Sequence, residues 1–355
     1  MLFCARIDVL LNLLLRHRHL SASRYLKIAV TFVLCLILQR YIKREEQLYR
    51  ETVQYIPIKE DPVFITGHWR SGTTFLHYLM ALDTDTFACP TTYQCFFPTI
   101  FLTVSERSRA YRMLKRAWGT RTRLIDNMPF DLTSPQEEEW MYLPEGGFSY
   151  VEKLFFPKTS VVSDFAATLG LSTDERTRDV TLKIFKKLAF VYNKRILSKS
   201  PGHFSRIPVL KELFPKGKFV FLVRNPYEVV VSMVRAKTIL GNLLSLQRHG
   251  GYDIVSTSKF LAFYFQIMKA NLGLLEPAAY VIVRYEDLVK EPLASVKTIY
   301  EALGIRYSEK FEAALHAGLS SFEGYQRNIL TITEPMKEVI YRECHRIFEE
   351  FGYGR

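Results

Sequence analysis

The sequence lacks the cysteine pattern of a disulfide-stabilised or zinc-binding protein. Its 355 residues include five cysteines at irregular spacing, and no two of them form a C-x-x-C pair. This excludes a small disulfide scaffold and a zinc-ribbon site, because both depend on closely spaced cysteines. Cys89 and Cys95 could pair in an oxidising compartment, but two buried thiols fit the sequence better. We expect no metal site and a reducing compartment such as the cytoplasm.

The chain also lacks the evenly basic composition of a nucleic-acid-binding protein. It has 48 Lys and Arg against 36 Asp and Glu, a formal net charge of +12, but residues 1–44 alone hold eight of the cations and only one anion. No zinc-finger, homeodomain or RNA-binding signature is present. The expected partners are therefore an anionic cofactor and, through residues 1–44, an acidic membrane surface, rather than nucleic acid.

No apolar run reaches the length of a typical membrane span. The run from Ile28 to Leu38 is bounded by Lys27 and Arg40, whereas a bilayer span needs roughly 20 residues. A cleaved signal peptide is disfavoured, because no small-x-small cleavage site follows the run. Residues 1–55 are predicted to form an apolar and basic segment. It is either a helix packed on the protein, a peripheral anchor that meets acidic headgroups, or a membrane anchor that spans the bilayer.

A glycine-rich loop follows at residue 67. Residues 62–65 are β-branched and aromatic, as in a buried strand, and residues 75–82 are apolar, as in a helix. Between them the chain reads Gly67-His68-Trp69-Arg70-Ser71-Gly72-Thr73-Thr74. The glycines let successive N–H groups point inward, and the helix N-terminus adds partial positive charge. This pattern predicts a cradle for a phosphate-like anion.

The loop lacks the lysine of nucleotide-hydrolase P-loops. Thr73 stands where G-x-x-x-x-G-K requires lysine, and the cation of the loop is Arg70. The strand-like run 219–223 ends in Arg224 rather than in an acidic magnesium ligand. A P-loop kinase or NTPase is therefore an alternative that the sequence disfavours.

Several motifs resemble those of sulfotransferases that use 3′-phosphoadenylyl sulfate (PAPS). Residues 64–76 resemble the 5′-phosphosulfate loop of the group whose loop reads R-S-G-T-T, and residues 199–203 (K-S-P-G-H) resemble its K-S-P-x-H element. Residues 214–232 resemble its 3′-phosphate element, strand-R-x-P-x5-S. Two shorter matches are the P-x-E-x-E run at 135–139 and R-Y-E-D-L at 284–288. The motifs occur in family order, so the resemblance covers most of the chain.

Strands and helices alternate along most of the sequence. Strands are expected at about 62–66, 195–198, 219–223 and 280–284, with helices between them, which predicts an α/β fold with a parallel β-sheet flanked by helices. The resemblance implies the P-loop NTPase-like sulfotransferase fold for a domain spanning residues 56–355. Residues 96–175 interrupt the alternation and are rich in aromatic side chains. We expect them to form a helical cap that binds the acceptor.

The resemblance also implies which residues bind the donor. The 5′-phosphosulfate would be held by the loop from Gly67 to Thr74, namely Gly67, His68, Trp69, Arg70, Ser71, Gly72, Thr73 and Thr74. PAPS carries a second anion, its 3′-phosphate, for which Arg224 offers a bidentate fork and Ser232 a hydroxyl about two helical turns later. Arg327, in a late glycine and basic stretch, is a further candidate phosphate contact. No metal is expected.

Sulfuryl transfer needs cations at the transferring group and a base at the acceptor hydroxyl. Arg70 and Lys199 are the candidate cations. His203 and Glu137 rank almost level as the general base, since histidine titrates near neutrality and many sulfotransferases use a glutamate. Glu138 and Glu139 belong to the same acidic run, which could instead be an ordinary solvated helix start.

These observations predict a PAPS-dependent sulfotransferase that acts on a hydroxyl acceptor. A lipid, a glycan and a small alcohol all remain open as acceptors. The alternatives are the P-loop kinase or NTPase and a non-catalytic, membrane-associated nucleotide-binding protein. The leading hypothesis requires the guanidinium groups of Arg70 and Arg224 to converge beside one cavity.

Overall fold

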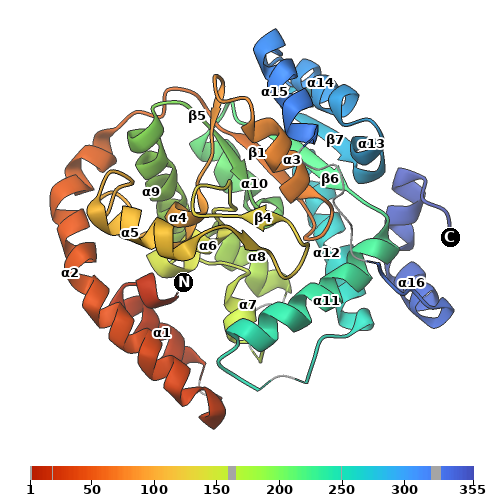
Figure 1. Ribbon diagram of the computed structural model, residues 1–355. Coiled ribbons are helices and arrows are strands. Elements are labelled where there is room, and N and C mark those ends of the chain that lie inside the picture. The colour runs from red at the N-terminus through yellow and green to blue at the C-terminus, as the bar shows by residue number, and fades with distance from the viewer. Residues whose placement is uncertain (1, 18, 159–164, 249, 321–328) are drawn as a thin grey trace.

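A five-stranded parallel sheet forms the centre of the protein (Figure 1). The computed structural model describes residues 2–17, 19–158, 165–248, 250–320 and 329–355. The strand order is β2-β5-β1-β6-β7. The strands are β1 (Val63–Gly67), β2 (Phe87–Ala88), β5 (Arg195–Lys199), β6 (Lys218–Val223) and β7 (Tyr280–Arg284). The parallel sheet and the four predicted strands are confirmed, and the short edge strand β2 is an addition that the sequence did not predict.

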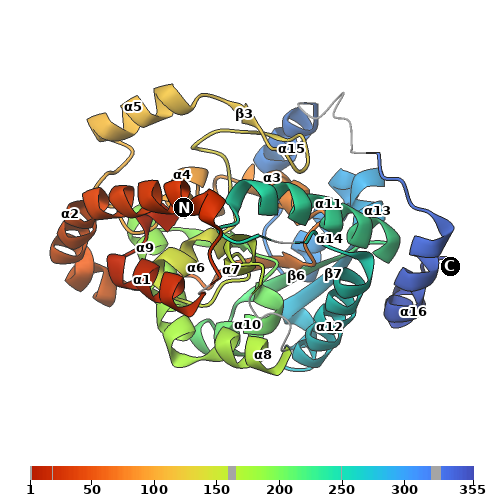
Figure 2. The same cartoon turned by 90° about the horizontal axis from the view of Figure 1, so that it is seen from below.

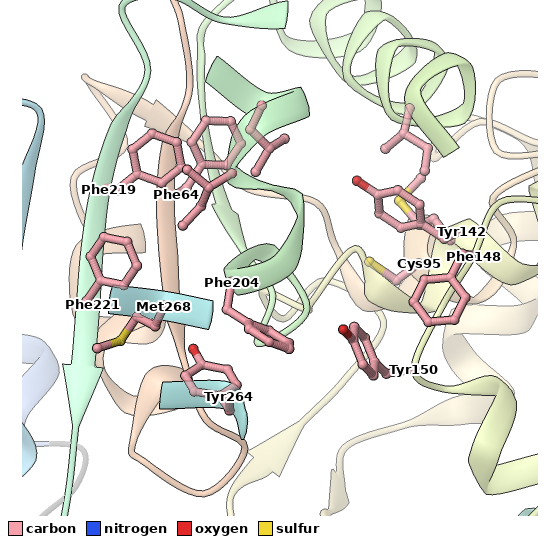
Figure 3. Close-up of a cluster of buried hydrophobic side chains, with 14 of the residues drawn as sticks. Phe64, Cys95, Tyr142, Phe148, Tyr150, Phe204, Phe219, Phe221, Tyr264 and Met268 are labelled. Atoms are coloured by element: carbon pink, nitrogen blue, oxygen red, sulfur yellow. The ribbon is translucent and has the colours of Figure 1, made fainter. Parts of the chain in front are cut away.

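Alternate residues of the central strands feed two separate hydrophobic cores. Phe64 of β1 and Phe219 and Phe221 of β6 point to one face of the sheet, where they pack with side chains from α10 and α12 (Figure 3). Ile65 and Val220 point to the other face, toward α3 and α14. Because both faces are covered, these strands read as continuous apolar runs rather than alternating ones.

Helices flank the sheet on both faces, as the alternating pattern predicted. Asn225 caps α11 by accepting a hydrogen bond from the Tyr227 N–H, and Pro226 occupies its first turn, where proline is tolerated. The helices that follow the strands are α3 (Thr73–Ala81), α9 (Glu175–Tyr192), α10 (His203–Leu213), α11 (Pro226–Leu244), α12 (Ile254–Leu272), α13 (Tyr285–Lys290), α14 (Pro292–Ala302), α15 (Glu309–Ser320) and α16 (Glu334–Phe351).

Most elements between residues 92 and 173 are short. The basic helix α5 stands away from the rest of the protein in Figure 2. A two-residue antiparallel pair, β3–β4, accompanies the helices. The elements are α4 (Thr92–Phe96), α5 (Arg109–Trp118), β3 (Arg121–Thr122), β4 (Pro129–Phe130), α6 (Glu139–Glu145), α7 (Glu152–Phe155) and α8 (Phe165–Thr173).

The N-terminal residues form two helices along one side of the protein (Figures 1 and 2). The elements are η1 (Leu2–Cys4), α1 (Ile7–Arg16), η2 (Ala22–Arg24) and α2 (Tyr25–Tyr55). The helical stretch Ala22–Tyr55 is long and apolar enough to cross a membrane, although the expected apolar run was shorter. The second half of α2 is tied to the rest of the protein, since the Glu45 carboxylate lies 2.6 Å from the buried Lys187 ammonium.

Candidate active site

A cavity of about 320 Å³ lies beside the glycine-rich loop, at the carboxyl edge of the sheet. Trp69, Arg70, Thr73 and Thr74 of the loop region line one part of it, together with Glu137. Apolar and aromatic side chains line most of the rest, and three lysines lie among them. The apolar and aromatic residues include Trp140, Val151, Leu154, Met233, Ala236, Leu240 and Phe260, and the lysines are Lys153, Lys237 and Lys259. A larger cavity of about 590 Å³ lies between α2 and α9, but none of the predicted site residues lines it.

The two glycines of the loop are required by close packing. Gly67 has a φ of 154°, and a Cβ there would lie 2.5 Å from the Leu222 carbonyl oxygen. Gly72 has a φ of 96° and caps α3, and a Cβ there would collide with the Tyr285 ring. The hydroxyl oxygen of Ser71 is buried and has no hydrogen-bond partner in the described parts of the chain. A turn of this shape with an unsatisfied hydroxyl fits an anionic ligand.

Arg70 crosses from the loop to α11. It has a positive φ of 77°, a strained backbone conformation for a residue other than glycine. Its Nε donates to the Ser232 hydroxyl at 3.0 Å, and one Nη donates to the Ile125 carbonyl at 3.2 Å. The Asp126 carboxylate lies 3.4 Å from the other Nη. Arg70 and Ser232 therefore belong to one cluster, although the sequence assigned them to two separated anion sites.

Arg224 joins the same cluster from the end of β6. Its Nη1 donates to the Arg70 carbonyl at 3.0 Å, and its guanidinium stacks 4.1 Å from the centre of the Tyr285 ring. Arg224 also forms an ion pair with Glu228, one turn along α11. The two arginines are therefore in contact, through the Arg224 guanidinium and the Arg70 backbone, but only Arg70 lines the cavity. Arg327 lies outside the described residues.

His68 lies behind the loop rather than in the cavity. Its ring packs edge-on against Tyr264, with 5.3 Å between ring centres, and its Nδ1 lies 2.8 Å from the Trp69 carbonyl oxygen. Burial lowers the pKa of His68 to about 3, so the imidazole is neutral. Its side chain supports the loop from the core side.

The three neighbouring glutamates point in different directions. Glu137 lines the cavity, and its carboxylate lies 2.6 Å from the Lys199 ammonium. Glu138 is fully buried and faces His203. Glu139 is also buried and forms a two-pronged ion pair with Arg206, at 2.7 and 3.0 Å. The alternative interpretation of this acidic run, an ordinary solvated helix start, is therefore wrong, because Glu138 and Glu139 are buried.

His203 has no exposed surface and does not line the cavity. Its Nε2 lies 2.5 Å from the Glu138 carboxylate and 2.7 Å from the Ser198 hydroxyl, and its ring packs edge-on against Phe64. Burial opposes ionisation of Glu138, yet His203 and Ser198 hold the pKa of that carboxyl down at about 2. The structure therefore separates the two candidate bases: Glu137 is at the cavity and His203 is in the core.

Sequence reasoning missed several charged residues at this site, including Asp126 and Lys237. Asp126 pairs with both Arg70 and Arg123, at 3.4 and 3.3 Å. Lys237 lines the cavity from α11. Neither belongs to a recognisable motif, so no sequence signal marked them. Within the described residues, no group of three or more His, Cys, Asp or Glu side chains is arranged to hold a metal ion.

An anion cradle at the carboxyl edge of a parallel sheet, with a lysine-paired carboxylate, Glu137, at the adjoining cavity, suits a group-transfer enzyme that binds a phosphorylated cosubstrate. The sequence profile of the Sulfotransferase family matches residues 62–309. An omega-hydroxy-beta-dihydromenaquinone-9 sulfotransferase of Mycobacterium tuberculosis is 30% identical over 308 residues, covering 84% of this chain and 76% of that protein. Human carbohydrate sulfotransferase 5 is 25% identical over 280 residues, covering 72% and 64%.

The solved structures agree on the fold. A sulfotransferase from Mycobacterium avium superimposes with a TM-score of 0.68 at 17% identity, covering 98% of this chain and 95% of that one. The chain belongs to the sulfotransferase family and is a sulfotransferase enzyme. The predicted family, fold class and activity are confirmed, and the kinase or NTPase and the non-catalytic nucleotide-binding protein are set aside. The family implies PAPS as the sulfuryl donor.

Proposed function

We propose that this sulfotransferase transfers the sulfuryl group of PAPS to a hydroxyl on a lipid-like acceptor, with Glu137 as the general base. The observation that carries the proposal is the composition of the cavity. Its loop part presents Thr73, Thr74 and Glu137, and most of the remaining wall is apolar or aromatic, with Lys153, Lys237 and Lys259 among these side chains. An acceptor with an apolar body would bury its surface there and leave its hydroxyl at the polar part. The mycobacterial relative is named for an omega-hydroxy menaquinone.

The donor would be held by the loop and by the arginine cluster. We assign the 5′-phosphosulfate to the Gly67–Thr74 loop, whose tight turn and helix N-terminus suit an anion. The 3′-phosphate is assigned to Arg224 and Ser232. Arg70 would shift from the Ser232 hydroxyl toward the donor when PAPS enters, because a charged phosphate is a stronger acceptor than a hydroxyl.

The reaction would proceed by in-line displacement at sulfur. The acceptor oxygen forms a bond to sulfur while the bond from sulfur to the bridging phosphate oxygen breaks, and 3′,5′-adenosine bisphosphate leaves. The proton of the acceptor hydroxyl passes to the Glu137 carboxylate. Lys199, 2.6 Å from that carboxylate, orients it and supplies positive charge near the leaving oxygen.

Donor binding can be tested with two single variants. Arg70→Ala and Arg224→Ala should each weaken binding of 3′,5′-adenosine bisphosphate by about 1.5–3 kcal/mol, as expected for charged hydrogen bonds. Isothermal titration calorimetry measures the change, and the exposed Arg342→Ala is the matched control. Unchanged affinity in both variants would contradict the donor assignment.

We further propose that α1 and the first half of α2 bind an acidic membrane surface. Leu26, Val30 and Val33 are exposed along α2, and basic residues accompany them, as in interfacial helices. The start of α2 lies against the end of α11, since Lys27 bonds to the Leu243 carbonyl. Leu240, one turn earlier on α11, lines the cavity, so a bound membrane would lie close to the acceptor site.

Vesicle sedimentation tests membrane binding. The protein should sediment with vesicles that contain phosphatidylglycerol, more weakly with phosphatidylcholine alone, and a Leu26→Asp, Val33→Asp double variant should lose binding. Equal sedimentation of the variant and the parent would contradict this role for α2.

A further inference from the structure

Lys237 of α11 places a cation in the apolar part of the cavity. Its ammonium lies 5.6 Å from the centre of the Phe260 ring and 5.8 Å from that of Tyr252. Phe260 also contacts Trp69 of the donor loop, with 6.2 Å between ring centres. Phe260 therefore lies between Lys237 and the donor loop, and two aromatic rings lie beside the Lys237 ammonium.

The other charges at the cavity wall make Lys237 distinct. The lining residues include five cations, Arg70, Arg123, Lys153, Lys237 and Lys259, and one carboxylate, Glu137. Arg70 and Arg123 both pair with Asp126, and Glu137 pairs with Lys199. In the described parts of the chain, neither Lys237 nor Lys259 forms an ion pair, but Lys259 is exposed whereas Lys237 is half-buried.

This environment is unfavourable for an isolated ammonium. Burial lowers the pKa of Lys237 to about 8, nearby Lys153 acts in the same direction, and Asp253 opposes them only partly. A partly desolvated cation without a counter-ion costs free energy that an incoming anion would recover. Aromatic rings compensate less well than a carboxylate or phosphate does.

We propose that Lys237 binds an anionic group on the acceptor, so that the preferred acceptor is an amphiphile carrying both a hydroxyl and a negative charge. This inference rests on the proposed function, since it describes the acceptor of the same site. The donor is a poorer occupant, because its two anionic ends are already assigned to the loop and to Arg224 with Ser232. Lys237 lies five residues beyond Ser232, about 7–8 Å further along the helix.

The experiment compares two acceptors of equal chain length, an ω-hydroxy fatty acid and the corresponding fatty alcohol, with labelled PAPS. The wild-type protein should have a kcat/KM at least about tenfold higher for the acid, a typical effect of one charged hydrogen bond. Lys237→Met should abolish this preference by raising the KM of the acid, and Lys237→Arg should retain part of the preference. The KM for PAPS should not change.

Lys269→Met is the matched control. Lys269 also lies over an aromatic ring, 5.7 Å from the centre of Phe265, but it is exposed, pairs with Glu350 and does not line the cavity. Its substitution should leave the acid-to-alcohol ratio unchanged. Equal kcat/KM for the two acceptors in the wild-type protein would overturn the inference while leaving the proposed function intact. A Lys237→Met variant with weakened binding of 3′,5′-adenosine bisphosphate would overturn it too, by assigning Lys237 to the donor.

A binding measurement separates the inference from the proposed function. Trp69 and Trp140 line the cavity, so their fluorescence should report the binding of a fatty acid that lacks the hydroxyl. Loss of fatty-acid binding in Lys237→Met supports the anion site, whether or not the two acceptors are sulfated. If neither acceptor were sulfated, that outcome would contradict the proposed function and not the anion site. Equal binding of the fatty acid by the wild-type protein and Lys237→Met overturns the inference.

Discussion

The cavity wall and the buried layer beneath it use the same residue types for different purposes. Glu137 and Glu138 are neighbours in sequence, yet Glu137 faces the cavity beside Lys199 and Glu138 faces the core beside His203. Glu139 is buried too, against Arg206. The direction in which the chain turns at the start of α6 therefore decides which carboxylate is available for chemistry.

The buried layer holds the cavity layer in place. The Glu138 carboxylate accepts hydrogen bonds from the Ser198 hydroxyl and the Lys199 backbone N–H, and the Glu139 carboxylate accepts one from the Ser200 hydroxyl. These contacts fix the turn between β5 and α10. Because Lys199 ends β5 directly before that turn and its own N–H bonds to Glu138, its ammonium is positioned at Glu137 by buried carboxylates outside the cavity. The comparison predicts that substitutions in the two layers affect different measurements.

The largest effect is expected in the cavity layer. Glu137→Gln should lower kcat by about 10²–10⁴, the usual contribution of a general base, and leave the affinity for 3′,5′-adenosine bisphosphate almost unchanged. Steady-state kinetics with labelled PAPS measures the loss, with the exposed Glu106→Gln as control.

His203 provides the contrast. His203→Gln should destabilise the protein, because it breaks the buried pair with Glu138. If His203→Gln instead folded with wild-type stability and lost all turnover, while Glu137→Gln stayed active, the base would be His203 and the contrast between the layers would be wrong.

The next effect is on stability, in the buried layer. Arg206→Met should lower the free energy of unfolding by about 3–5 kcal/mol, because it leaves the Glu139 carboxylate buried without its partner. Urea denaturation measures the loss. Arg178→Met, which removes an exposed ion pair with Glu212, is the control and should change little. A loss at Arg206 no larger than that of the control would show that the buried layer is not held by this pair.

The sequence predicts the sheet and the loop well because both depend on neighbouring residues. The strand at 63–67, the glycine turn and the start of α3 are specified by a short stretch, and the structure reproduces them. The contact between Arg70 and Arg224 was expected only from the resemblance to PAPS-binding sulfotransferases, because the pairing of β1 with β6, which brings the carboxyl ends of these strands to one edge, is not encoded in either stretch alone.

Contacts between distant segments could not be predicted in the same way. Whether Glu137 or Glu138 faces the cavity depends on how α6 packs against β5 and α10, which no local pattern encodes. The same holds for Asp126 beside Arg70, and for Lys237, whose cavity is formed by helices far apart in the chain. The length of α2 was underestimated because its second half is polar and is stabilised by packing, as at Glu45 with Lys187.

The smallest predicted effect concerns a histidine under the loop. His77 of α3 is fully buried, and burial, aided by the nearby Lys199 charge, lowers its pKa from 6.5 to about 3. The unfolded chain binds a proton at this histidine below about pH 6.5, whereas the folded protein does not, so stability is complete above that pH and falls as the pH decreases toward 3. The free energy of unfolding should therefore decrease by up to about 1.4 kcal/mol per unit of falling pH for this one group.

Urea denaturation between about pH 6.5 and 5 tests this pH dependence. His77→Leu should reduce the slope of the free energy of unfolding against pH by up to that amount, and the exposed His345→Gln should leave the contribution of His77 in place. An unchanged slope in His77→Leu would mean that His77 takes up its proton in the folded protein at the same pH as in the unfolded chain. Water would then reach the side chains beneath the loop, against what their burial indicates.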